Sequence, residues 1–167
     1  AYDLKTAQQR WQFFCDGPVR FPPVAWKENL YVASDDGNLY CLNALDGSLR
    51  WTFRAAPSQR AIIGNKRVTS TWPVRGAPVI KDGTLYCAAS IWPFMGTFFY
   101  ALDAQSGKVI WKNDGMGAQY LKQPHGAPSF AGVAPQGIFS ATEKYLVIPG
   151  GRSFPAVFDR ASGQQLH

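Results

Sequence analysis

Basic and aromatic residues gather in three separate stretches of this 167-residue chain. Residues 52–73, 112–134 and 149–155 together hold seven bases and one acid, a net charge of +6 that equals the formal net charge of the whole chain. Such stretches attract anions, and the aromatic rings among the bases can stack on a planar ligand or anchor a protein partner. The alternative is that the bases are only solvated and the rings only pack long loops. The candidate contact residues are Arg54, Arg60, Lys66, Arg67, Trp72, Trp92 and Arg152.

Catalytic and metal-binding patterns are not found in the sequence. The two histidines, His125 and His167, are far apart and have no Cys, Asp or Glu at ligand spacing, so no metal site is expected. The three cysteines are odd in number and scattered, which favours free thiols over a disulfide framework. The acids fall mostly in Asp-Gly and similar turns, and no catalytic residue can be nominated.

Nucleic-acid binding is not favoured either. The string IIGNKRVTS at 62–70 places a Gly and a Lys near hydroxyl groups but lacks the spacing of a phosphate-binding loop, so we interpret it as an ordinary basic loop. The basic charge is not accompanied by an RNA- or DNA-binding motif. No apolar run is long enough to cross a membrane.

The elements that must position the three stretches are repeats of one phrase. AYDLKTAQQRW at 1–11 recurs as CLNALDGSLRW at 41–51, as ALDAQSGKVIW at 101–111 and as VFDRASGQQLH at 157–167. A second phrase, VRFPPV at 19–24 with LYVAS at 30–34, recurs as VRGAPV at 74–79 with LYCAA at 85–89, and a blurred relative covers 134–149. Four copies in one short chain indicate a repeat protein. In register, the copies align Asp3, Asn43, Asp103 and Asp159, then Gly47, Gly107 and Gly163, then Trp11, Trp51, Trp111 and His167.

Each repeat has the pattern of four short antiparallel strands. The apolar runs are rich in Val, Ile, Tyr, Phe and Leu and are separated by turn signals such as Asp-Gly and Ser-Gly, and no long run has a helical period. In the first full unit we expect strands at about 22–26, 29–34, 38–43 and 50–54. A repeated four-stranded unit of about 40 residues is typical of a β-propeller blade. The units are expected at about 1–18 (partial), 19–54, 74–114 and 134–167.

The repeated phrase resembles the tryptophan docking motif, A-x-D-x-x-T-G-x-x-x-W, of the quinoprotein-like propeller family, which includes pyrroloquinoline quinone (PQQ) dehydrogenases and non-catalytic relatives. The resemblance implies that the tryptophans lie on the outer strands and pack against the next blade, and that the chain functions in the periplasm or cell envelope. Two copies depart from the motif, because Ala7 replaces the glycine and His167 replaces the tryptophan. The residues assigned to docking are Trp11, Trp51, Trp111, Asp3, Asp103, Asp159, Gly47, Gly107 and Gly163.

The expected fold is all-β: a partial propeller of about three four-stranded blades plus an orphan strand pair, from a seven- or eight-bladed ring. About three blades do not close a ring of the usual size. We therefore expect the ring to be completed by the remainder of a longer polypeptide or by a second copy of the chain.

Insertions lengthen the repeats on one side only. The connection from a fourth strand to the next first strand grows from 12 residues (Trp11 to Pro23) to 27 (Trp51 to Pro78). Further residues enter between the second and third strands, near 90–96 and 149–154. Both kinds of connection leave an up-and-down sheet on the same side, which is therefore expected to carry function.

These patterns favour a non-catalytic binding or scaffold module with a basic, aromatic loop face, whose partner is a protein or an anionic ligand. No cofactor is evident. The alternative is part of a PQQ-dependent alcohol or sugar dehydrogenase, in which the three carboxylates of the quinone would suit Arg and Lys and a Ca²⁺ ion would accompany it. Neither the adjacent cysteine pair of the alcohol-oxidising branch nor a C-x-x-C-H haem site occurs in the sequence.

Overall fold

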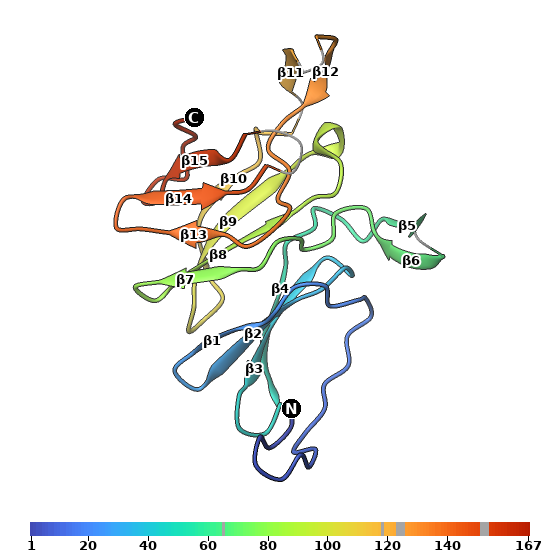
Figure 1. Cartoon of the computed structure of the whole chain (residues 1–167), viewed down its shortest axis with the longest axis vertical. Helices are drawn as coiled ribbons and strands as arrows, with labels where there is room; N and C mark the ends of the chain where they lie inside the picture. The colour runs from blue at the N-terminus through green and yellow to red at the C-terminus, as the bar shows by residue number, and fades with distance from the viewer. Residues whose placement is uncertain (65, 118, 123–125, 151–153) are drawn as a thin grey trace.

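Small antiparallel β-sheets, packed side by side, make up the computed structural model of the chain (Figure 1). The structure describes residues 1–64, 66–117, 119–122, 126–150 and 154–167. The first sheet has the order β1 (Val24–Trp26), β2 (Asn29–Ala33), β3 (Asn38–Asn43), β4 (Leu49–Arg54). The second has β7 (Val79–Lys81), β8 (Thr84–Ala89), β9 (Phe98–Asp103) and β10 (Val109–Asn113) in the same up-and-down order. The expected all-β architecture with four-stranded blades is confirmed.

The two ends of the repeat array differ from the four-stranded pattern. The third sheet contains β13 (Ser140–Ala141), β14 (Tyr145–Ile148) and β15 (Ala156–Asp159), and an isolated bridge from Phe158 to Gln165 stands where a fourth strand was expected. The expected orphan strand pair at 1–18 is reduced to a turn closed by a single bridge between Tyr2 and Gln9.

Sheet packing follows from the two-residue period of the strands. In β8 and β9, Leu85, Cys87 and Leu102 belong to the core shared with the first sheet. Their immediate neighbours Tyr86, Ala88 and Ala101 belong to the core shared with the third sheet. The middle blade is therefore apolar on both faces, as radial stacking of blades requires.

Two connections contain hairpins that the sequence did not predict. Between β4 and β7 lies β5 (Ala61–Gly64) paired with β6 (Arg67–Ser70), so the interpretation of 62–70 as an ordinary loop is wrong. Between β10 and β13 lies β11 (Gln119–Lys122) paired with β12 (Pro128–Ala131). The 3-10 turn η1 (Pro93–Met95) lies in the connection from β8 to β9.

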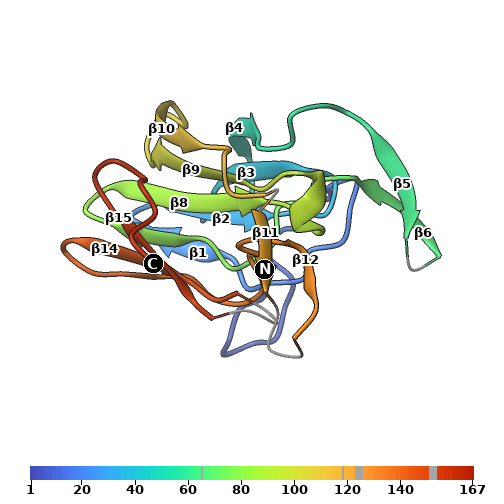
Figure 2. The ribbon, with the colours of Figure 1, turned by 90° about the horizontal axis from the view of Figure 1, so that it is seen from above.

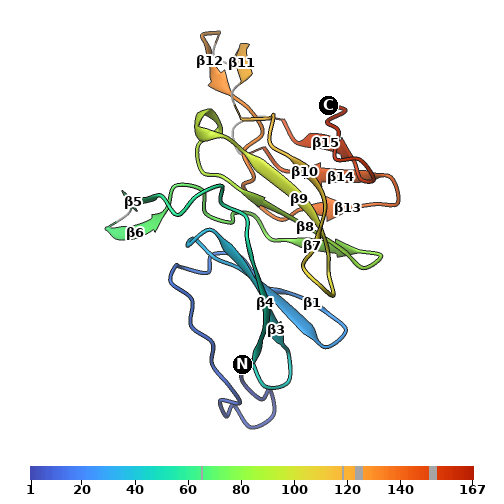
Figure 3. The same ribbon diagram turned by 180° about the vertical axis from the view of Figure 1, so that it is seen from behind.

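The extra elements lie at one end of the blade strands. Figures 1 and 3 show the β5–β6 hairpin, the β11–β12 hairpin and η1 on the opposite side from the β1–β2, β7–β8 and β13–β14 turns. Figure 2 shows the β5–β6 hairpin projecting beyond the stacked sheets. We call the side with the two hairpins and η1 the elaborated side, and the side with the tight turns the short side.

Candidate functional site

The bases of the β5–β6 region are exposed on the elaborated side. Arg54 ends β4, Arg60 precedes β5, Lys66 sits in the hairpin turn at a φ of 62°, and Arg67 begins β6. Within the described part of the chain, none of the four has a carboxylate within 4 Å. Their positive charges are therefore available to a partner.

Exposed apolar side chains accompany these bases. Ile63 and Val68 are cross-strand partners near the hairpin tip and are 85% and 67% exposed. At the start of η1, the preceding Trp92 and Phe94 stack with ring centroids 6.1 Å apart, and both are more than half exposed. We name the bases Arg54, Arg60, Lys66 and Arg67 with Ile63, Val68, Trp92 and Phe94 the basic-apolar surface.

Two of the remaining candidate contact residues, Trp72 and Arg152, are not assigned to this surface. Trp72 is half-buried, donates its indole N–H to the Met95 carbonyl at 2.7 Å, and meets Phe98 edge to face. It therefore packs the connection after β6 against the η1 loop, as expected of an aromatic residue that secures a loop. Arg152 lies outside the described residues.

A buried carboxylate that sequence reasoning missed joins the elements of this side. Asp35, interpreted from the sequence as an ordinary turn residue, is 1% exposed and is ion-paired to Arg20 and, at 3.3 Å, to Arg75. The Asp35 carbonyl accepts hydrogen bonds from the backbone of Ser70 and the hydroxyl of Thr69, both at 2.9 Å. Two guanidinium groups compensate the charge of the buried carboxylate. Through Arg75 the carboxylate holds the segment before β7 against the first blade, and the Asp35 carbonyl holds β6 there. The sequence signal for this cluster was the arginine that recurs at the same place in VRFPPV and VRGAPV, as Arg20 and Arg75.

Tryptophans from the repeated phrase lie against glycines of the next copy. Trp11 donates its indole N–H to the carbonyl of Ala44 at 3.2 Å, Trp51 to that of Gln105 at 3.1 Å and Trp111 to that of Arg160 at 3.0 Å. A Cβ added at Gly47, Gly107 or Gly163 would lie 2.4, 2.9 or 2.5 Å from the respective indole ring. Each of these glycines has a φ between 71° and 75°.

The aspartates of the same phrase close the turns beneath the tryptophans. Asp103 and Asp159 each accept hydrogen bonds from the backbone and the hydroxyl of the serine three residues later, which lowers their pKa values. In the first copy, ion pairing with Arg10 and two backbone donors lower the pKa of Asp3 to about 2. Ala7 takes the positive-φ position of that turn, at 55°, without being glycine.

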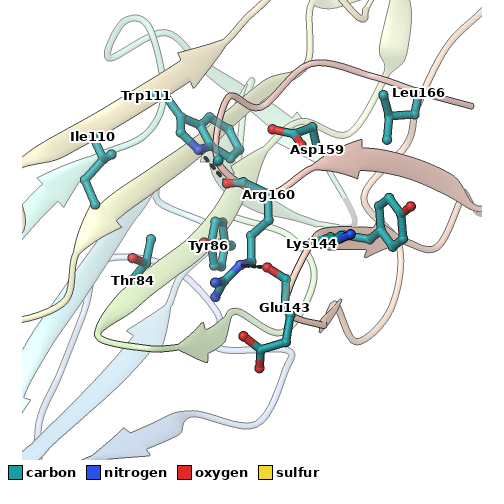
Figure 4. Close-up of a pocket in the computed structure, with 11 residues that line it drawn as sticks. Thr84, Tyr86, Ile110, Trp111, Glu143, Lys144, Asp159, Arg160 and Leu166 are labelled. Carbon is teal, nitrogen blue, oxygen red and sulfur yellow. Dashed lines mark hydrogen bonds between the residues drawn. The ribbon is translucent and has the colours of Figure 1, made fainter.

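A pocket of about 510 Å³ opens on the groove between the second and third sheets (Figure 4). Trp111 and the buried Tyr86 line it from the second sheet, with ring centroids 5.9 Å apart. Arg160 approaches Tyr86 from the third sheet, donates to the Glu143 carbonyl at 3.1 Å and pairs with Asp82 at 3.0 Å. Ile110 and Lys144 stand on opposite sides of the opening.

The thiols and histidines form no recognisable centre in the described part of the chain. Cys41 and Cys87 are buried free thiols, and burial raises their pKa values to about 11 and about 12, while Cys15 is half-buried and also free. Across residues 1–64, 66–117, 119–122, 126–150 and 154–167, no group of three His, Cys, Asp or Glu residues could hold a metal ion. Among the same residues no helix is long and apolar enough to span a membrane. His125 lies outside the described residues.

Comparison with known structures shows which class of fold this is. The chain superposes on BamB from Moraxella catarrhalis with a TM-score of 0.64 at 16% identity, covering 99% of this chain and 40% of that one. It superposes on quinohemoprotein alcohol dehydrogenase ADHIIG from Pseudomonas putida HK5 with a TM-score of 0.60 at 16% identity, covering 87% and 25%. The fold is therefore that of a β-propeller.

Sequence comparisons indicate which kind of β-propeller the chain resembles. The family model described as outer membrane protein assembly factor BamB (PQQ_2) matches residues 1–71. Polyvinylalcohol dehydrogenase of a Pseudomonas species is 28% identical over 127 residues, which are 74% of this chain and 18% of that protein. The dehydrogenase subunit of the quinone-type alcohol dehydrogenase of Gluconacetobacter polyoxogenes is 33% identical over 99 residues, 59% of this chain and 13% of that protein. These matches support a PQQ-like repeat propeller related both to an assembly factor and to quinone-type dehydrogenases.

Proposed function

We propose that this chain is a non-catalytic PQQ-like-repeat propeller module that binds an acidic protein partner through its basic-apolar surface. The observation that carries the proposal is that four exposed bases in and beside the β5–β6 hairpin have no described carboxylate within 4 Å, while exposed apolar pairs lie on the same elaborated side, at the hairpin and at η1. Apolar anchors ringed by charges of one sign are the arrangement by which protein interfaces gain both affinity and orientation. The similarity to an assembly factor supports this proposal.

A rigid scaffold beneath the surface fits the same function. We interpret the indole–glycine contacts as a tryptophan docking motif that fixes each blade on the next, with the aspartates holding the turns. Asp35 and its two arginines then fix the elaborated side on this scaffold. Loops built on such a support lose less entropy on binding. By the same relatives, we place the chain in the periplasm or cell envelope.

The test uses two variants of equal charge. In the first, Arg54, Arg60, Lys66 and Arg67 are replaced by glutamine. In the control, four exposed bases at or next to the short-side turns, Lys5, Arg10, Lys27 and Lys108, are replaced by glutamine. The probe is a synthetic peptide that alternates Glu and Phe, and its dissociation constant is measured by fluorescence anisotropy at two salt concentrations.

We expect the first variant to lose binding by about tenfold or more and the control to retain it, with unchanged circular dichroism in both. Equal losses in the two variants would show attraction to net charge alone and would contradict the proposal. Undiminished binding by the first variant would also contradict it.

A second candidate function is part of a PQQ-dependent dehydrogenase, and the matches to quinone-type dehydrogenases favour it. Arg20 and Arg75, from the repeated segments that lead into β1 and β7, are already paired with Asp35. These two arginines could bind the carboxylates of the quinone only if that cluster were broken. Adding PQQ and Ca²⁺ and measuring a bound chromophore and dye-linked oxidation of alcohols or sugars distinguishes the two functions.

A further inference from the structure

The two grooves between neighbouring blades are built from equivalent positions, so each serves as a reference for the other. Strand pairing aligns Tyr31 with Tyr86, because they face Val24 and Val79 in the same register. It also aligns Trp51 with Trp111, which face Cys41 and Ala101. Residues that neighbour these rings in the two grooves can therefore be compared one by one.

In the groove between the first and second sheets, a chain of hydrogen bonds fills the space outside the tyrosine. Arg50 donates to the Asn29 side chain at 2.6 Å, Asn29 donates to the hydroxyl of Tyr31 at 3.0 Å, and Tyr31 donates to the Ala104 carbonyl at 2.7 Å. Asn29 and Tyr31 are buried.

In the groove between the second and third sheets, the same positions hold shorter or apolar side chains. Thr84 takes the place of Asn29, and Ile110, which is 55% exposed, takes the place of Arg50. The Arg–Asn–Tyr chain of the other groove has no counterpart here, because the Ile110 side chain cannot donate a hydrogen bond, and the polar neighbours of Tyr86 are Thr84 and Arg160. The pocket of about 510 Å³ lies at this place and has the size typical of small-molecule sites (Figure 4).

Of the charged side chains that line this pocket, all except Lys144 have an ion-pair or hydrogen-bond partner among the described residues. Glu143 pairs with Lys81 at 2.5 Å, Asp159 is bonded within its turn to Ser162, and Arg160 is paired with Asp82. Lys144 has no carboxylate within 4 Å among the residues the structure describes, and the corresponding residue of the other groove is Gly83. Lys144 and Gly83 are equivalent because their carbonyls accept corresponding backbone hydrogen bonds, Lys144 from Arg160 and Gly83 from Ala104.

We infer that the groove between the second and third sheets is a binding site for a small apolar monocarboxylate. The carboxylate pairs with the Lys144 ammonium, and the apolar body lies between Ile110, Leu166 and the Tyr145 ring, each at least 44% exposed in the free chain. Thr84 supplies a hydroxyl at the edge of the pocket. This site is on the short side and is independent of the basic-apolar surface.

The test compares 3-phenylpropionate with its neutral isostere 3-phenylpropionamide by calorimetric titration of the whole chain. We expect the acid to bind about tenfold more tightly than the amide, because only the acid forms a charge-assisted pair with Lys144. Lys144→Gln should remove this difference, and the control Lys108→Gln, which changes an exposed lysine of a neighbouring turn, should preserve it.

A second variant tests the shape of the site. The double substitution Thr84→Asn with Ile110→Arg introduces the residues of the other groove and should abolish binding of both probes while thermal unfolding stays cooperative. Equal binding of acid and amide by the natural chain, no binding of either, or equal effects of Lys144→Gln and Lys108→Gln would each overturn the inference.

Discussion

Replacing Gly107 by alanine is expected to destabilise the contact between the first and second blades strongly. The added Cβ would lie 2.9 Å from two atoms of the Trp51 ring, closer than carbon atoms pack, and the residue has a φ of 71°. Left-handed backbone costs alanine about 1–2 kcal/mol, and forcing an extra carbon against a packed ring adds about 1–3 kcal/mol. The expected loss in the free energy of unfolding is therefore about 2–5 kcal/mol.

Alanine variants of two other glycines, Gly126 and Gly115, distinguish the cost of backbone strain from the cost of steric overlap. Gly126 has a φ of 92° but nothing within 4 Å of an added Cβ, so Gly126→Ala should cost only the backbone share, about 1–2 kcal/mol. Gly115 also has open space, and its φ lies outside the left-handed range, so Gly115→Ala should change stability by less than about 1 kcal/mol.

The assay is urea unfolding of the three variants at pH 7, followed by tryptophan fluorescence and far-ultraviolet circular dichroism. The expected order of loss is Gly107→Ala, then Gly126→Ala, then Gly115→Ala. An equal loss for Gly107→Ala and Gly126→Ala would refute the reasoning, because the indole contact would then contribute nothing beyond the backbone conformation.

Three further predictions concern buried polar groups. Thr71→Val should leave stability unchanged or raise it by about 1 kcal/mol in urea unfolding, because the Thr71 hydroxyl is buried without a described hydrogen-bond partner; a clear loss would contradict this. Asp35→Asn should lower the free energy of unfolding by about 2–4 kcal/mol, since it removes the charge between the two arginines, and Arg75→Gln should lower it less; neutrality of Asp35→Asn would exclude the proposed bracing role. Burial raises the pKa of Tyr31 and Tyr100 to about 12, so both groups stabilise the fold below their ordinary pKa near 10 and lose that contribution as the pH rises through 12. Absorbance at 295 nm should therefore show that the last tyrosinates, those of the buried rings, form together with the loss of circular dichroism, and titration of all seven tyrosines near pH 10 with the fold intact would contradict the burial.

The sequence predicted the blade sheets because their strands alternate between two buried faces. Phe99 and Leu102 in β9 point into different cores, and such strands need Val, Leu, Tyr and Phe at nearly every position. The β5–β6 hairpin was missed for the opposite reason. Ile63 and Val68 are exposed, so no buried face imposes a recognisable alternation on that segment.

The parts of the site that depend on distant residues could not be predicted from local patterns. Asp35 lies in an Asp-Asp-Gly-Asn turn, and its burial depends on Arg75, which is 40 residues later. The groove pocket depends on the replacement of Arg50 and Asn29 by Ile110 and Thr84 at equivalent positions. That difference becomes visible only when strand pairing sets the two grooves in register.

Amide hydrogen exchange on the chain with and without the alternating Glu–Phe peptide tests most directly that the elaborated side is the binding surface. We predict slower exchange on binding in 54–72 and 92–96, with no change in the short-side turns at 44–48 and 104–108. Protection confined to the short-side turns, or spread evenly over the chain, would contradict the assignment.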